Sequence, residues 1–225
     1  MFSMGTGILL TAGFAANARA ADYANLTVVK PALTCDQLAT ADIKAPDGTK
    51  VTIKTAKQRD TDKGPYCRVT GSIEPTVNFQ GDLPLNNWTQ RFLQGAQGRE
   101  GIERAGGCMP ALNGEFAVVT GGGAPGNVAD PAAGEWGIGP QGRIVSGYLG
   151  QHLTAVAFKS VIKAFYGQGP KYSYMAGCSG GGLETLMEAE RYPEDFNGYS
   201  IGVPPRALSM TISSSQPLAP SVSPG

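Results

Sequence analysis

Apolar residues along the chain fall into short runs that glycines and prolines interrupt. Residues 67–73 and 76–80, separated by Pro75, show the alternation of half-buried strands. The apolar runs at residues 91–94 and 116–120 each end at a glycine, as buried strands do where they lead into loops. These four segments predict the interior of a sheet.

The second half of the chain alternates between helical and strand-like patterns. Residues 152–166 carry apolar side chains at near-helical spacing, and residues 180–191 repeat this pattern before Pro193. Strand-like runs at residues 172–176 and 196–203 follow the two helical patterns. Strands that alternate with helices imply a parallel sheet covered by helices. We therefore predict an α/β fold with a mostly parallel sheet and flanking helices.

The composition is that of an ordinary globular protein. The 225 residues are 41% hydrophobic and 16% charged, which provides enough apolar surface for one sizeable core. The 18 basic and 18 acidic residues cancel, and they form no dense basic run. Nothing in this charge pattern attracts nucleic acid or a membrane surface, so we expect neither as a partner.

The first twenty residues have the pattern of a targeting segment. An apolar stretch at residues 7–16 is followed by Ala18-Arg19-Ala20, which fits an A-x-A cleavage site, although no Lys or Arg precedes Arg19. The stretch is shorter than the ~20 apolar residues that span a membrane. We expect residues 1–20 to be a signal peptide, residues 21–225 to be the mature chain, and the protein to be secreted or periplasmic.

The cysteine content agrees with an oxidising compartment, where disulfides persist. No C-x-x-C pair occurs, which argues against a structural zinc site. Four cysteines allow three pairings, and their spacing does not choose among them. They are Cys35, Cys67, Cys108 and Cys178.

The most informative motif is Gly177-Cys178-Ser179-Gly180-Gly181, which fits the G-x-S-x-G nucleophile elbow. A strand pattern precedes it and a helical pattern follows, as the elbow requires. We predict that Ser179 is a catalytic nucleophile and that the N–H of Gly180 is one oxyanion donor. The turn after residues 91–94 makes Gly95 the candidate for the second donor. The alternative is a glycine-rich turn without chemistry, since the chain has 32 glycines.

Longer stretches around the motif resemble the tannase and feruloyl esterase family of α/β-hydrolases. The resemblance rests on residues 177–182 and 187–198, and extends upstream through residues 165–167, 88–94 and 67–69. It implies that residues 21–225 are the N-terminal portion of an α/β-hydrolase domain, without its last strands and lid domain. It also implies hydrolysis of aromatic carboxylic esters, such as hydroxycinnamates or gallates, through an acyl-enzyme on Ser179.

The resemblance also bears on the cysteines. In the family, the cysteine beside the nucleophile pairs with one beside the catalytic histidine, so Cys178 would lack its partner here. The resemblance further implies a Cys35–Cys67 disulfide. Cys108 then has no obvious partner, and a simple packing thiol is one interpretation of it.

A serine needs a histidine to take its proton and a carboxylate to orient that histidine, and in this fold both follow the serine. The only histidine, His152, precedes Ser179, so we interpret it as a packed or capping residue, with a general base as the alternative. In the family, a lid with a calcium site and then the acid and base would follow. We therefore expect a fragment with no metal or cofactor that is inactive alone. The carboxylates after the nucleophile are expected to form a solvated face; they are Glu184, Glu188, Glu190, Glu194 and Asp195.

Parts of the sequence are also compatible with two other classes of function, a dinucleotide-binding enzyme and a binding protein without catalysis. Residues 121–126 and 137–142 match the G-x-G-x-x-G pattern of dinucleotide sites, but Pro131 and several glycines follow the first match, and no strand precedes the second. In the tannase and feruloyl esterase family that the chain resembles, an Asp and a His stand where this chain has Gly121 and Ala124. We therefore expect the wall of the active site to differ from the family's at these two positions. A non-catalytic secreted binding protein that reuses the fold is the main alternative to an esterase. Oligomeric state is left open.

Overall fold

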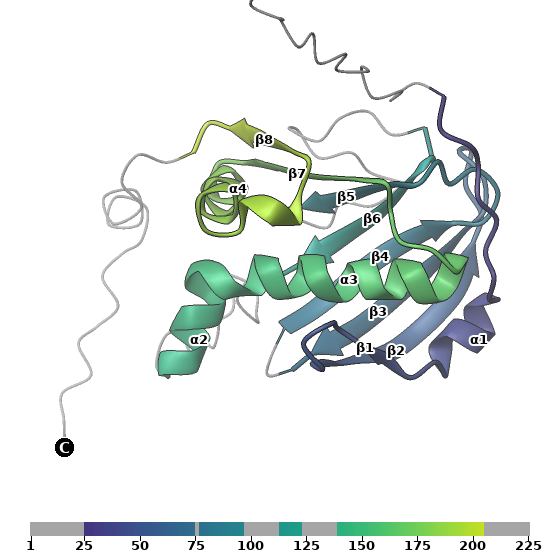
Figure 1. Cartoon of the computed structure of the whole chain (residues 1–225), viewed down its shortest axis with the longest axis horizontal. Helices are drawn as coiled ribbons and strands as arrows, with labels where there is room; N and C mark the ends of the chain where they lie inside the picture. Colours follow the sequence, from purple (N-terminus) through teal and green to yellow (C-terminus); the bar gives the residue numbers. More distant parts are fainter. Residues whose placement is uncertain (1–24, 75–76, 97–112, 123–138, 205–225) are drawn as a thin grey trace, which may run out of the picture.

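The computed structural model describes residues 25–74, 77–96, 113–122 and 139–204, which form one mixed sheet with helices against one face (Figure 1). The strand order is β1-β2-β3-β4-β6-β5-β7-β8. The strands are β1 (Ile43–Lys44), β2 (Lys50–Arg59), β3 (Tyr66–Ile73), β4 (Val77–Pro84), β5 (Arg91–Gly95), β6 (Phe116–Gly121), β7 (Tyr172–Cys178) and β8 (Gly198–Gly202).

Strands β1 to β4 form an antiparallel half of the sheet, and β4 also pairs antiparallel with β6. The prediction of a mostly parallel sheet is therefore wrong for this half. Few residues separate β2 from β3 and β3 from β4, and so short a connection can join only antiparallel neighbours. Sequence periodicity had located these strands without indicating their direction.

Strands β5 to β8 form the parallel half, as predicted. Strand β5 pairs with β6 and β7, and β7 pairs with β8, all in parallel. Parallel neighbours need long crossovers, and helices lie in the connections from β6 to β7 and from β7 to β8. The helical elements are α1 (Cys35–Ala39), α2 (Pro140–Ile144), a π-helical stretch (Val145–Leu149), α3 (Gly150–Tyr166), α4 (Gly180–Arg191) and a 3₁₀ turn, η3 (Pro193–Asp195).

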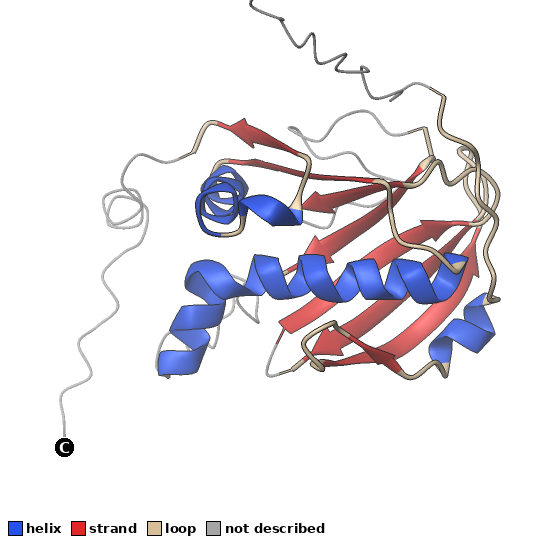
Figure 2. Cartoon of the chain, viewed as in Figure 1, coloured by secondary structure: helices blue, strands red, loops and turns tan. Residues whose placement is uncertain are grey.

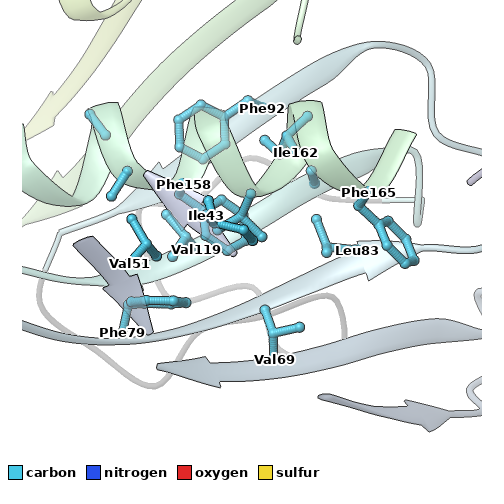
Figure 3. Close-up of a cluster of buried hydrophobic side chains, with 14 of the residues drawn as sticks. Ile43, Val51, Val69, Phe79, Leu83, Phe92, Val119, Phe158, Ile162 and Phe165 are labelled. Carbon is cyan, nitrogen blue, oxygen red and sulfur yellow. The ribbon is translucent and has the colours of Figure 1, made fainter. Parts of the chain in front are cut away.

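Helix α3 covers the middle of the sheet and forms the core with it (Figures 2 and 3). Phe158 lies between the two halves, with its ring 5.8 Å from those of Phe79 on β4 and Phe92 on β5. The helix ends at Gly167, whose φ of 77° is the left-handed conformation that glycine adopts without a Cβ clash. The predicted end of this helix at residue 166 is therefore confirmed.

Helix α1 was not predicted, and it fastens the N-terminal segment to the sheet. Thr34 and Gln37 form a reciprocal capping box at its start. A disulfide joins Cys35 to Cys67 on β3, which confirms the pairing that the family resemblance implied. The structure therefore ties the first described segment to the antiparallel half.

Several expectations concern residues outside the described ranges, namely the signal peptide at residues 1–20, Cys108 and most of the first glycine pattern. Helix α2 and the π-helical stretch that follows it were also not predicted, because glycines interrupt the helical spacing of apolar residues there. No helix in the described ranges is long and apolar enough to cross a membrane.

Candidate active site

Ser179 lies at the junction of β7 and α4, on the carboxyl edge of the parallel strands. Its φ of 53° and ψ of −121° are a conformation that L-residues rarely adopt, and the residue is exposed. Its N–H donates to the carbonyl of Gly202 at 3.0 Å, and its carbonyl accepts from the N–H of Leu183 at 3.1 Å. This is the strained, solvent-facing turn that a nucleophile elbow requires.

Glycines make the tight approach of strand and helix possible. A Cβ at Gly177 would overlap the carbonyl oxygen of Gly181, and one at Gly181 would overlap the carbonyl oxygen of Ala96. At Gly182, a Cβ would overlap the carbonyl oxygen of Gly202. The predicted need for glycine on both sides of Ser179 therefore has a direct steric cause.

The two predicted oxyanion donors lie on either side of this junction. Gly180 is the first residue of α4, where main-chain N–H groups have no acceptor within the helix. Gly95 ends β5 in register with Ala176, and the next residue, Ala96, donates to Ala176 at 2.9 Å. The end of β5 thus borders the first turn of α4, while the loop beyond Ala96 lies outside the described residues. The oxyanion roles of Gly95 and Gly180 remain predictions.

A buried polar network lies directly beneath the elbow, and the sequence reasoning missed it. The amide of Gln94 donates to the side chain of Gln151 at 2.7 Å and to its main chain at 2.9 Å. The amide of Gln151 donates to Glu184 on α4 at 2.6 Å and to the carbonyl of Gly121 at 3.0 Å. The network joins the ends of β5 and β6 to the starts of α3 and α4. The one sign of this network in the sequence is Gln94, a polar residue inside the apolar strand pattern of residues 91–94.

His152, on α3, lies beside the end of α4 that is remote from Ser179, too far away to act on it. Its Nδ1 is 2.6 Å from the carboxylate of Asp195, and its ring stacks on Tyr192 at 4.0 Å. Tyr192 caps the far end of α4, thirteen residues after Ser179, which is about 20 Å at 1.5 Å per helical residue. This geometry supports the interpretation of His152 as a packed residue.

The expectation that the carboxylates after Ser179 form a solvated face is wrong for three of the five. Glu188 is 1% exposed, and Glu184 and Asp195 are partly buried, so only Glu190 and Glu194 match the expectation. The helix turns Gly181, Gly182 and Thr185 towards the sheet because small residues allow the closest packing, and Glu188 follows on the same face. The buried face of α4 is therefore set by the spacing of its glycines and not by its leucines, Leu183 and Leu186.

A second expectation to be corrected concerns the pairing of Cys178. The structure makes it a disulfide cysteine, so the prediction that it has no partner in this chain is wrong. Its partner lies outside the described residues, as does Cys108. A disulfide at this position restrains the strand directly before Ser179.

Within the described residues, one group of side chains lies close enough to share a cation. Ligand atoms of His152, Glu188 and Asp195 are within 4.8 Å of one another. The ammonium group of Lys159 donates to the main-chain carbonyl of Asp195, and this positive charge disfavours a cation beside it. A separate apolar hollow of about 350 Å³, lined by residues such as Leu93, Phe116 and Tyr174, does not include Ser179.

A strained serine between a parallel strand and a helix, flanked by obligatory glycines, defines the α/β-hydrolase class. The crystal structure of an esterase from Aspergillus oryzae shares this fold, with a TM-score of 0.56 and 22% identity over 74% of this chain and 37% of that one. A family model described as tannase and feruloyl esterase matches residues 61–212. The chain belongs to the tannase and feruloyl esterase family.

Two curated relatives show the same affiliation. Mono(2-hydroxyethyl) terephthalate hydrolase of Piscinibacter sakaiensis is 32% identical over 161 residues, covering 62% of this chain and 26% of that protein. The protein named Probable feruloyl esterase of Arthroderma benhamiae is 33% identical over 133 residues, covering 54% of this chain and 24% of that protein. The chain thus spans about a quarter of the length of these two relatives.

Proposed function

We propose that the chain carries the nucleophile portion of a secreted serine carboxylic ester hydrolase. The observation that carries the proposal is the backbone of Ser179, whose strained turn exposes the hydroxyl at the start of α4. Strain of this kind persists only where the surrounding structure holds it in place, and it concentrates at functional sites. In the proposed reaction, the hydroxyl of Ser179 attacks the ester carbonyl, the alcohol leaves, and water hydrolyses the acyl-enzyme.

The proposed substrates are esters of aromatic acids, such as hydroxycinnamates, gallates or a terephthalate monoester. The names of the relatives support this substrate class. The Cys35–Cys67 disulfide supports export to an oxidising compartment, either outside the cell or in the periplasm. Acyl transfer of this kind needs no cofactor.

We further propose that the acid and the base come from elsewhere in a longer polypeptide. His152 is the only histidine among the 225 residues, and it is paired with Asp195 at the far end of α4. Without a nearby imidazole, a serine hydroxyl is a poor nucleophile. The same observation favours the second candidate, a secreted binding protein that keeps the fold without catalysis.

Hydrolysis assays on two proteins test the proposal. The first is the 225-residue chain, and the second is a chimera that continues after Val203 with the corresponding residues of the Piscinibacter sakaiensis hydrolase. We expect background hydrolysis of methyl ferulate, methyl gallate and the terephthalate monoester by the chain alone. The chimera should hydrolyse at least one of them, and Ser179→Ala should abolish that turnover.

Two results would contradict the proposal. Turnover by the 225-residue chain that Ser179→Ala abolishes would show that a base is already present. A chimera that folds, as judged by circular dichroism, and retains its turnover after Ser179→Ala would remove Ser179 from the chemistry. A folded but inactive chimera that binds these esters would favour the binding protein.

A further inference from the structure

The far end of α4 holds a second cluster of titratable groups, remote from Ser179. The carboxyl group of Glu188 is buried, and neither of its oxygens has a hydrogen-bond partner in the structure. It lies within 4.8 Å of the carboxylate of Asp195 and the imidazole of His152. A buried carboxylate without partners is costly, so the group needs either a proton or a compensating charge.

The surroundings of Glu188 come from every element packed against this end of α4. Helix α3 contributes His152, which donates to Asp195, and Lys159, whose ammonium group reaches the Asp195 main chain and lies 5.2 Å from the ring of Phe196. The other titratable or charged groups nearby are Tyr148 from the π-helical stretch, Arg191 and Tyr192 from the end of α4, Glu194 from η3, and Tyr199 from β8.

The charges of this cluster balance when one proton is added. The ammonium of Lys159 neutralises one of the two carboxylates, which leaves the other as an excess negative charge. A single proton brings the cluster to neutrality, whereas a divalent cation would leave it positive. Charge balance therefore favours a proton over a metal ion at this site.

We propose that Glu188 and Asp195 share one proton, and that this proton clamps the end of α4 to α3 and to η3. Burial, and next the neighbouring Asp195, raise the pKa of Glu188 to about 9. Burial alone would raise the pKa of Asp195, but its hydrogen bond with His152, and the one that a protonated Glu188 would donate to it, hold that pKa below its ordinary value. The proton therefore resides on Glu188 at neutral pH. The clamp does not depend on the proposed esterase activity.

The proposal predicts the pH dependence of stability. The pKa of Glu188 is higher in the folded state than in the unfolded state. Its contribution to the free energy of unfolding is therefore fully present below the unfolded-state pKa near 4.5, and is lost as pH rises towards the folded-state pKa of about 9. Across this window the folded state holds one proton more than the unfolded state. The folding equilibrium constant should therefore fall by up to about tenfold per pH unit, relative to a protein without this group.

The test compares urea unfolding of the wild-type chain, Glu188→Gln and Glu190→Gln across this window. The amide of Glu188→Gln cannot titrate but can still donate to Asp195, so its stability relative to wild type should increase with pH. Glu190 is exposed on the same helix, and Glu190→Gln should follow the wild-type profile. If the free energies of unfolding of wild type and Glu188→Gln change in parallel with pH, the proposal is overturned.

Two measurements keep the proposal testable if the variant folds poorly. Infrared spectra of the wild-type chain at neutral pH should show a protonated carboxyl band that shifts on carbon-13 labelling of glutamate; its absence would overturn the proposal. Adding Zn²⁺ should leave the thermal midpoint of the wild type unchanged. A rise that Glu188→Gln abolishes would identify a metal site instead.

Discussion

The two halves of the sheet are stabilised in different ways. In the antiparallel half, a disulfide joins α1 to β3, and Arg68 on β3 makes two hydrogen bonds to the buried carboxylate of Asp82 on β4, at 2.9 and 3.0 Å. In the parallel half, Ser179 has a strained backbone, and the buried Oε1 of Gln94 has no hydrogen-bond partner in the structure. The antiparallel half therefore contains the cross-links whose two partners are both described, whereas the parallel half contains a strained residue and an unpaired buried polar atom, which cost free energy.

This difference indicates a division of labour between scaffold and site. Strain and incompletely satisfied polar groups are tolerated where a rigid neighbour holds them in place. Helix α3 connects the two halves, because Phe158 contacts aromatic rings on β4 and β5. The following predictions separate the contributions of the two halves, from the largest expected effect to the smallest.

Removing the Cys35–Cys67 disulfide should have the largest effect. The bridge closes a loop with a sequence separation of 32, so Cys35→Ala with Cys67→Ala should lower the free energy of unfolding by about 3–4 kcal/mol. Urea unfolding measures the loss, and hydrogen exchange should place it in α1, β2 and β3. Lys57→Ala on exposed β2 is the control, and an equal loss there would contradict a specific role of the bridge.

Breaking the network beneath the elbow should have an intermediate effect. Gln151→Ala removes one of the two hydrogen bonds that the buried amide of Gln94 donates, and takes away the donor to the carbonyl of Gly121 and to Glu184, at a cost of about 1–3 kcal/mol. Gln168→Ala removes a glutamine with a surface hydrogen bond to Gln90, and should change stability by less than about 0.5 kcal/mol. Hydrogen exchange should increase in β5, β6 and α4 only for Gln151→Ala. A uniform increase over both halves would show that they unfold as one unit.

Relieving the strain at the elbow should produce a small gain. Glycine adopts the Ser179 conformation without a Cβ clash, so Ser179→Gly should raise the free energy of unfolding by about 1 kcal/mol, after the entropy of the more flexible unfolded chain is subtracted. Ser179→Ala keeps the Cβ and should leave stability nearly unchanged. Equal stabilities of the glycine and alanine variants in calorimetry would argue against stored strain.

The parallel half could be predicted closely from the sequence. Glycines and prolines mark the ends of its elements, and α4 has the predicted bounds because Ser179 and Pro193 flank it. The antiparallel pairing could not be predicted, since alternation places side chains on two faces without fixing strand direction. The capped helix α1 was missed because five residues are too few for a helical period.

The candidate site was only partly accessible from sequence. The motif identified Ser179 and its glycines, because their conformations are local. The roles of Gln151, Glu184 and Glu188 depend on which residues from distant elements face them, and no spacing within one element carries that information. The helix face that is buried was set by the close approach of Gly181 and Gly182 to the sheet.

The hydrogen bond from Ser179 to Gly202 has a consequence for the order of folding. The elbow is a short stretch of sequence, yet its backbone is held by Gly202 on β8, 23 residues after Ser179. Until β8 docks, Gly182 also lacks the main chain that it packs against. The conformation of the nucleophile therefore depends on the docking of β8 as well as on its own strand and helix. Among the described strands β8 is one of the two edge strands of the sheet, so any chain that pairs with its open side would also influence Ser179.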